Sequence, residues 1–242
     1  MNKNKIIQMI DKILLAIICV GLIISAFLIG SPLENNMECI ITIINFMGLV
    51  YTILKIFLER KNIFLNNPVL ILLMILLTSS FFSLIFRNMT SLSDTIKNIL
   101  NLISIISLVV ILVNNKTEDK IKYIISSIII SCLMLAIIGI DNLTVNSLKD
   151  IMKQLGNVDV NNIDARMMGN FGYANTFGIC MALGFILTLV RYTNTESKIS
   201  KIIYSILLVI FFESIILSYS RGTWISIFLI VLIYLWILKN IV

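Results

Sequence analysis

Long runs of apolar side chains, separated by short polar stretches, make up most of this chain. Eight such runs can be marked, at residues 13–30, 37–57, 69–86, 96–113, 121–140, 171–190, 202–220 and 223–238. Each is close to the ~20 residues that a helix needs to cross the hydrocarbon core of a bilayer. The runs are continuously apolar rather than alternating, which favours helices over the strands of a membrane barrel. The pattern therefore predicts an all-α integral membrane protein with about eight transmembrane helices.

Composition and charge support this prediction and limit the kinds of partner and ligand that the chain is expected to bind. Of the 242 residues 59% are hydrophobic and 13% charged, whereas a soluble domain has about 25% charged residues. Lys and Arg outnumber Asp and Glu by 19 to 13, but no basic patch is interleaved with aromatic side chains, so no nucleic-acid partner is expected. The chain has no histidine, and its four cysteines have no CxxC spacing. We therefore expect packing cysteines, no histidine-based catalysis and none of the usual zinc sites.

The distribution of Lys and Arg between alternate loops predicts the orientation. Loops on one side are rich in these residues, beginning with Lys3, Lys5 and Lys12 before the first helix, and the loops between them carry few. By the positive-inside rule both termini are then cytoplasmic. The start of the chain lacks a small-residue cleavage site, so we interpret it as a retained anchor. No repeat or linker divides the chain, and residues 1–242 are predicted to form a single polytopic membrane domain.

The longest polar stretch, residues 141–170, is an extracytoplasmic loop in this topology. Its apolar residues recur at helical spacing, at Val145, Leu148, Ile151, Met152 and Leu155. They predict a short amphipathic helix, with Asn142 or Thr144 as its N-cap and Gly156 at its end. Such a helix either lies on the outer leaflet or packs on its neighbours within a solvated loop.

Two polar clusters are expected at the outer ends of the last three helices. The first, DARMMGNFGYANTFG from Asp164 to Gly178, contains Arg166, closely spaced glycines and Asn175. The second, LSYSRGTWI from Leu217 to Ile225, forms a very tight outer turn. Arginine binds phosphate through a planar fork, glycine lets the backbone approach a ligand, and asparagine offers a donor and an acceptor. These residues predict recognition of a phosphorylated, membrane-held substrate from outside.

Glu213 is the acidic residue that lies deep in a predicted span, in its outer half. A charge at mid-bilayer costs about 2.5–3.5 kcal/mol, so it usually faces a cavity or a partner. Arg221 follows eight positions later, about 80° beyond two turns of a continuous helix, which puts both on broadly the same side. We expect Glu213, Arg166 and Arg221 to share one outer cavity with Gly172 and Asn175, and Glu213 is a candidate general base. Each of these residues also has a simpler interpretation. Glu213 only pairs with an arginine, and the arginines reach to lipid head groups. The glycines shape a turn and allow close helix packing.

Together the two clusters resemble elements of a known family. RMMGNFGYAN is similar to the Arg–x–x–Gly–x–Phe–Gly–x–Pro–Asn element of the O-antigen ligase and polymerase family, with Ala174 at the proline position. LSYSRGTWI resembles that family's Thr/Ser–x–Ser–Arg–Gly element. The matching residues are Arg166, Gly169, Phe171, Gly172, Asn175, Ser218, Ser220, Arg221 and Gly222. The family-like region covers residues 166–225.

The resemblance implies a GT-C-like helical core in a bacterial plasma membrane. It implies transfer or polymerisation of a glycan from an undecaprenyl-diphosphate donor to a lipid, protein or glycan acceptor, without metal or cofactor, in cell-surface polysaccharide assembly. The substrate-binding residues would be Arg166, Gly169, Gly172, Asn175, Ser220 and Arg221, with the arginines holding the diphosphate leaving group. Family members continue into a large outer loop and further helices, so the chain resembles a C-terminally truncated product, a part of a split gene or a reduced member.

Two other function classes fit a polytopic membrane protein. A transporter or lipid-linked glycan flippase would carry polar residues through the bilayer midplane, often on broken helices. A non-catalytic membrane assembly partner would need no convergent arginines. The crowding of polar groups at the outer face favours glycan transfer over both.

Overall fold

A computed structural model describes residues 3–28, 46–50, 53, 68–86, 118–144 and 166–241, and single helical positions at 99, 102–103, 105–106 and 109. All regular structure within these ranges is helical, with no strand, which confirms the predicted all-α class. Contacts divide the chain into two units, one of residues 1–14 and 35–122 and one of residues 15–34 and 123–242. Helix α1 (Lys3–Leu28) contributes to both, and each unit is described by itself.

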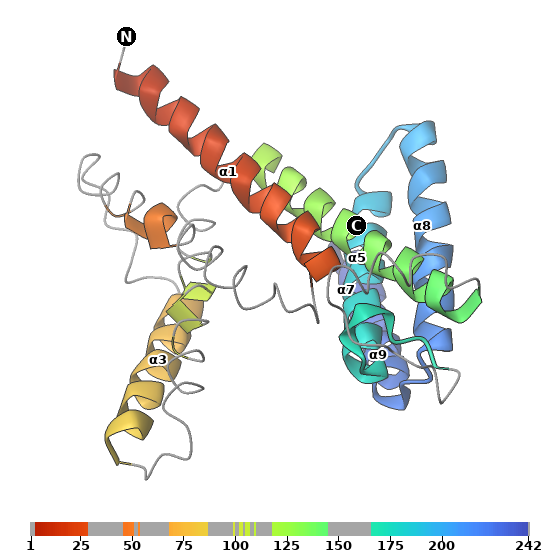
Figure 1. The fold of residues 1–242 in the computed structure, drawn as a ribbon. Coiled ribbons are helices and arrows are strands. Elements are labelled where there is room, and N and C mark those ends of the chain that lie inside the picture. Colours follow the sequence, from red (N-terminus) through yellow and green to blue (C-terminus); the bar gives the residue numbers. More distant parts are fainter. Residues whose placement is uncertain are drawn as a thin grey trace. The chain divides into compact units, whose positions relative to one another are not determined.

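The first unit is represented mainly by α3 (Pro68–Phe86), a helix without a charged residue (Figure 1). Pro68 begins it, where the missing N–H of proline costs no helical hydrogen bond. The hydroxyls of Thr78 and Ser79 donate to the carbonyls of Ile75 and Leu76 at 2.8 Å. These bonds satisfy the polar groups within the helix, as apolar surroundings require. A small cluster around buried Ile106 is completed by Leu49, Leu73, Leu77 and Val109.

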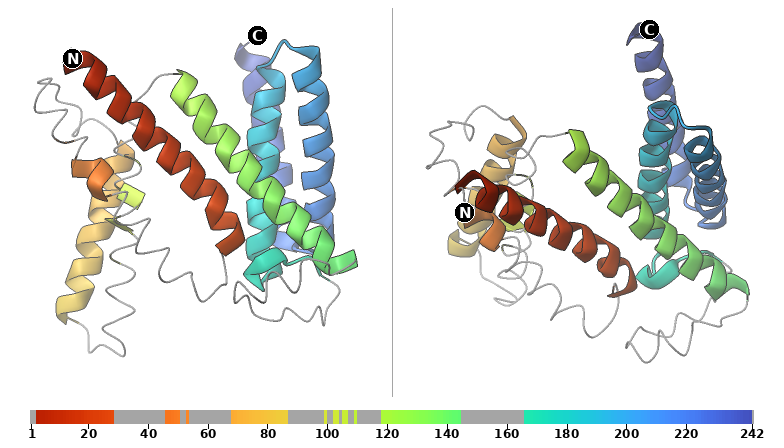
Figure 2. Two further views of the ribbon diagram at one scale, coloured as in Figure 1. Left: turned by 45° about the horizontal axis from the view of Figure 1, so that its top comes forward. Right: turned by 90° about the horizontal axis from the view of Figure 1, so that it is seen from above.

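The second unit contains the predicted motif region. Its elements are α5 (Glu118–Thr144), the short 3₁₀ turn η1 (Gly169–Phe171), α7 (Ala174–Thr193), α8 (Lys198–Leu217) and α9 (Arg221–Ile241). Figure 2 shows α7, α8 and α9 side by side, with α5 crossing them at an angle. Because α8 runs opposite to α7 and α9, η1, the start of α7, the end of α8 and the start of α9 meet at one end. We call this end, residues 166–175 and 217–223, the turn end.

The core of the second unit lies where α5, α7 and α8 approach one another. Phe177 of α7 and Phe211 of α8 are fully buried there. A β-carbon added at Gly184 would lie 2.8 Å from the β-carbon of Cys132 on α5 and 3.1 Å from the Phe211 ring. The glycine therefore permits the close helix approach that is typical of membrane packing. Cys132 is buried beside it, and its thiol donates to the carbonyl of Cys180 at 3.3 Å, so Cys132 has the packing role that the sequence predicts.

Three helical stretches are long and apolar enough to cross a membrane, namely Asp119–Thr144, Ala174–Thr193 and Lys198–Leu217. Shorter apolar stretches cover Lys12–Ile24 and Arg221–Trp236. Large hydrophobic side chains cover the outward faces of α8 and α9, which is consistent with contact with lipid. Transmembrane helices are therefore supported. The total of eight spans and the cytoplasmic termini stay predictions, since most of the spans at 37–57 and 96–113 lies outside the described residues.

The other predicted spans coincide with helices α1, α3, α5, α7, α8 and α9. The end of the fifth predicted span, at residue 140, is too early, because α5 continues through Asn142 to Thr144. Both lie in the last turn of α5, where the Thr144 hydroxyl donates to the Ile140 carbonyl at 2.8 Å. The apolar periodicity of α5 simply continues into the polar stretch. The predicted amphipathic helix at Val145–Leu155 lies outside the described residues.

Candidate functional site

The first motif forms a tight turn that leads into α7. Gly169, the first residue of the short η1 turn, and Gly172, directly after it, have φ values of 56° and 63°. Glycine adopts this left-handed conformation without the steric cost that a β-carbon brings. A β-carbon at Gly169 would also lie 2.9 Å from the Phe177 ring. Both glycines therefore shape the turn, and Gly172 is exposed at its surface.

Arg166 joins the first motif to the second. Its Nε donates to the Ser218 carbonyl and its Nη2 to the Tyr219 carbonyl, both at 3.2 Å. Next to it, the backbone N–H of Met167 donates to the Leu217 carbonyl at 2.9 Å. The last carbonyls of a helix have no partner within the helix and carry partial negative charge, so a cation is favoured there. Arg166 therefore caps α8 and brings the two motifs together.

The second motif reverses the chain in the three residues between α8 and α9. The Ser218 hydroxyl donates to the Ile215 carbonyl at 2.7 Å and accepts from the Ser220 N–H at 3.3 Å. The Thr223 hydroxyl donates to the Ser220 hydroxyl at 2.8 Å. Tyr219 has φ 50°, an uncommon conformation for a residue other than glycine. The turn is thus held by its own short side chains, and Ser220 has a structural role in it.

Gly178 of α7 packs directly on this turn. Ser218, Ser220 and Thr223 are at most 3% exposed, and we call them the hydroxyl cluster. A β-carbon at Gly178 would lie 2.8 Å from the Thr223 hydroxyl oxygen and 3.0 Å from the Ser218 hydroxyl oxygen. Small residues at such crossings let helices approach closely in a membrane. At Gly178, α7 therefore packs closely on the α8–α9 turn and on Thr223 of α9.

Arg221, the first residue of α9, is exposed. Within the described part of the chain its guanidinium makes no hydrogen bond and no ion pair. The start of a helix carries partial positive charge, so a cation there is unfavourable and an anion is favoured. The neighbouring Gly222 borders open space. Arg221 and the start of α9 together form a positively charged, accessible surface at the turn end.

Glu213 and Asn175 make no hydrogen bond or ion pair with either arginine in the described part of the chain. Asn175 is exposed in the first turn of α7, and its amide donates to the Tyr173 hydroxyl at 3.0 Å. Glu213 is exposed on α8 and forms no ion pair with a described residue. The helical extrapolation from Glu213 to Arg221 is wrong, because α8 ends at Leu217 and α9 runs back from Arg221. The role of Glu213 as general base stays a prediction.

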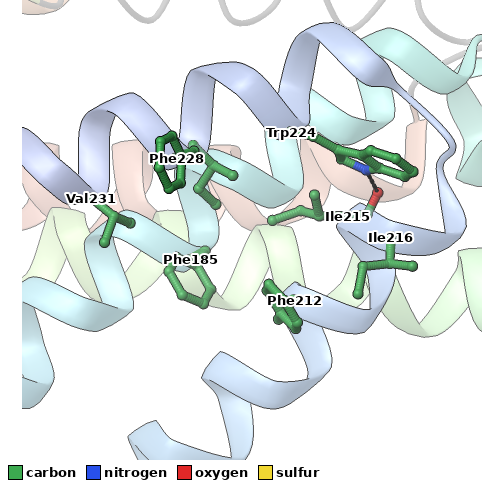
Figure 3. A pocket seen from close by; sticks show the side chains of 8 residues that line it. Phe185, Phe212, Ile215, Ile216, Trp224, Phe228 and Val231 are labelled. Atoms are coloured by element: carbon green, nitrogen blue, oxygen red, sulfur yellow. Dashed lines mark hydrogen bonds between the residues drawn. The ribbon is translucent and has the colours of Figure 1, made fainter.

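A cavity of about 600 Å³ lies between α7, α8 and α9 (Figure 3). Its lining comes from three helices, with Phe185 of α7, Phe212, Ile215 and Ile216 of α8, and Trp224, Ile227, Phe228 and Val231 of α9. All of these side chains are aliphatic or aromatic. None of the predicted site residues lines this cavity. The sequence reasoning missed it, although Phe212, Trp224 and Phe228 are large aromatic residues close to the turn.

Trp224 fixes α9 to α8 at the edge of this cavity. Its Nε1 donates to the Ile215 carbonyl at 3.0 Å, drawn as a dashed line in Figure 3. Tryptophan is common at membrane interfaces, and here its indole also makes a contact between helices.

Trp224→Phe is expected to lower the free energy of unfolding by about 0.5–1.5 kcal/mol, since it removes this hydrogen bond and keeps most of the ring. The measurement is reversible unfolding of purified protein in mixed detergent micelles. Trp236→Phe is the matched control, because Trp236 is 67% exposed and should tolerate the change. An equal loss in both variants would contradict a specific role for the Trp224 hydrogen bond.

No group of three or more His, Cys, Asp and Glu side chains that could hold a metal ion is found among the described residues. No protein-family model, curated protein or solved structure matches the chain. The case for a function therefore depends on the turn end itself.

Proposed function

We propose that this protein is a glycosyltransferase of the O-antigen ligase or polymerase type in the bacterial plasma membrane. It transfers a glycan from an undecaprenyl-diphosphate donor to an acceptor hydroxyl on the extracytoplasmic side. The observation that carries this proposal is the hydrogen-bonded contact between the two motifs. Arg166 of the first motif binds the turn of the second, and that turn leads directly into Arg221.

Electrostatics at the turn end support binding of a diphosphate. Two guanidinium groups and the start of α9 contribute positive charge, and no described carboxylate lies within ion-pairing distance of either arginine. Arg166 donates from Nε and Nη2 to backbone carbonyls and keeps its remaining N–H groups for a ligand. All the N–H groups of the Arg221 guanidinium are available for a ligand. In this proposal Arg221 is the principal diphosphate ligand, and Arg166 mainly positions the turn.

The proposed reaction is a substitution at the anomeric carbon of the donor glycan. The acceptor oxygen forms a new bond to that carbon, while the bond from the carbon to the diphosphate oxygen breaks. The electron pair of the broken bond stays on undecaprenyl diphosphate, whose charge the arginines stabilise. The acceptor proton passes to a general base, for which Glu213 is the candidate.

The proposal requires the turn end to face away from the cytoplasm. In a variant without native cysteines, Tyr173→Cys is expected to react with a membrane-impermeant maleimide in intact cells. Glu196→Cys, in the turn between α7 and α8 at the opposite end, should react only after permeabilisation. Both native side chains are exposed, so accessibility from one side decides the result. Labelling of Glu196→Cys and not Tyr173→Cys in intact cells would reverse the orientation and remove the proposed function.

The test of function is glycan transfer from undecaprenyl-diphosphate-linked donor in proteoliposomes that contain the full gene product. Arg221→Ala is expected to lower turnover roughly ten- to a hundredfold, through the loss of a charge-assisted contact of about 1.5–3 kcal/mol. Arg221→Lys should be almost as damaging, because lysine lacks the bidentate fork.

Lys239→Ala is the matched control, since it removes an exposed cation in the last turn of the same helix. Equal amounts of folded protein are compared in every case. Full turnover in both Arg221 variants would rule out Arg221 as the diphosphate ligand, and with it the proposed site.

A further inference from the structure

The cavity between α7, α8 and α9 has the chemistry of a hydrocarbon site. Its eight lining side chains are aliphatic or aromatic. The indole N–H of Trp224, the one polar side-chain group in that lining, is already bonded to the Ile215 carbonyl (Figure 3). An apolar concavity offers water no hydrogen-bond partner, so it takes up apolar ligands instead. In a bilayer such a ligand is a lipid chain.

The dimensions of the cavity match a chain that stays within one leaflet. On α9 the lining extends from Trp224 to Val231, about 10 Å along the axis at 1.5 Å per residue. A leaflet contributes about half of the 30 Å hydrocarbon core, roughly 15 Å. On α9 the cavity begins one turn after Arg221 and is shorter than the thickness of one leaflet. Its depth thus suits an acyl chain of a glycerophospholipid, which does not extend across the bilayer.

Charge at the mouth of the cavity selects the head group. Arg221 precedes Trp224 by three positions, and residues at this spacing lie on the same face of a helix. The guanidinium is exposed and has no partner in the described part of the chain. It therefore lies beside the head-group end of any chain that enters along Trp224, where a phosphate completes its hydrogen bonds.

We propose that this cavity binds one acyl chain of an anionic glycerophospholipid, whose phosphate is held by Arg221. The lipid is part of the protein in its membrane and covers the junction of α8 and α9. This site does not depend on the proposed glycan transfer. If both hold, the phospholipid and the diphosphate donor compete for Arg221.

The test uses the fluorescence of Trp224 in purified protein in detergent. Trp236→Phe leaves Trp224 as the sole tryptophan. The protein is titrated with phosphatidylglycerol that is brominated in the upper half of its acyl chains, because bromine quenches indole on contact. We expect saturable quenching at concentrations roughly tenfold lower than with brominated phosphatidylcholine, which has no net charge. Arg221→Ala should abolish this preference and leave quenching at high lipid concentration unchanged.

Two further measurements make the result decisive. Val231→Phe, which fills the deep end of the cavity, should lower the maximum quenching while the unfolding midpoint stays the same. Unlabelled undecaprenyl diphosphate is added as a competitor. The proposal is overturned by equal quenching with both phospholipids, by no effect of Arg221→Ala, or by much tighter binding of undecaprenyl diphosphate than of phosphatidylglycerol. The last outcome would assign the cavity to the polyprenyl chain.

Discussion

Replacing Gly178 with leucine is expected to separate α7 from the α8–α9 turn and to prevent stable folding of the second unit. Even the first added carbon would lie 2.8 Å from the Thr223 hydroxyl oxygen and 3.0 Å from that of Ser218. These oxygens belong to short side chains that are hydrogen-bonded to one another or to the backbone. They cannot move away as the end of a long side chain would. Overpacking of this kind costs on the order of 3 kcal/mol for leucine and less for alanine.

The measurement is the yield of monodisperse protein after solubilisation, together with the unfolding midpoint in mixed micelles. Gly222→Ala is the control for the first added carbon, because a β-carbon at Gly222 would meet no heavy atom within 4 Å apart from its chain neighbours and its own helix backbone. Alanine favours the helix more than glycine does, so this variant should be as stable as the parent or slightly more stable.

A double variant tests the mechanism of the loss. Gly178→Ala combined with Thr223→Ala removes the oxygen nearest to the added carbon, so the pair should lose less stability than the sum of the two single changes. Additive losses in the pair, or wild-type stability of Gly178→Leu, would contradict the close packing of α7 on the hydroxyl cluster.

The helices that coincide with predicted spans could be recognised in the sequence because a helix that crosses a bilayer needs a long, unbroken apolar run. Helix α3 begins and ends within one residue of the predicted span, since Pro68 and the polar residues after Phe86 bound an unbroken apolar run. The end of α8 was placed three residues too late, at 220 rather than Leu217. Ser218 and Ser220 fit a helix end and a turn equally well by composition, and only their hydrogen bonds show that they form the turn.

The candidate site could be predicted only in part. Both motifs were found by residue type, and their meeting at one end follows from the alternation of helix directions. The hydrogen-bond partners of Arg166 could not be predicted from the sequence. They are backbone carbonyls, which every residue has, so no residue type marks them. The alignment of Glu213 with Arg221 failed for a related reason, since helical periodicity does not continue through a reversal of the chain. The apolar cavity was missed because its lining residues are ordinary span residues when each helix is considered alone.

Arg166→Ala is expected to destabilise the turn end by about 2–3 kcal/mol. It removes two charge-assisted hydrogen bonds, each worth about 1.5–3 kcal/mol when well formed and less where solvent reaches them. It leaves the Ser218 and Tyr219 carbonyls without this partner at the end of α8. Arg166→Lys keeps the charge but has a single ammonium group in place of the fork, so it should recover about half of the loss. The measurement is the free energy of unfolding in mixed micelles, with amide hydrogen exchange at residues 217–224.

The same variants separate positioning from ligand binding, because a positioning residue and a ligand lose activity in different ways. If Arg166 mainly holds the turn, glycan transfer by Arg166→Ala and Arg166→Lys should fall in the same order as stability, with lysine partly restoring both. For Arg221, whose guanidinium bonds to no described residue, turnover should fall in the lysine variant while stability and exchange at 217–224 stay at parent values. Stability at the parent level in Arg166→Ala would contradict the capping role of this arginine. It would return Arg166 to the set of direct ligands, since its charge would then be free to bind the diphosphate together with Arg221.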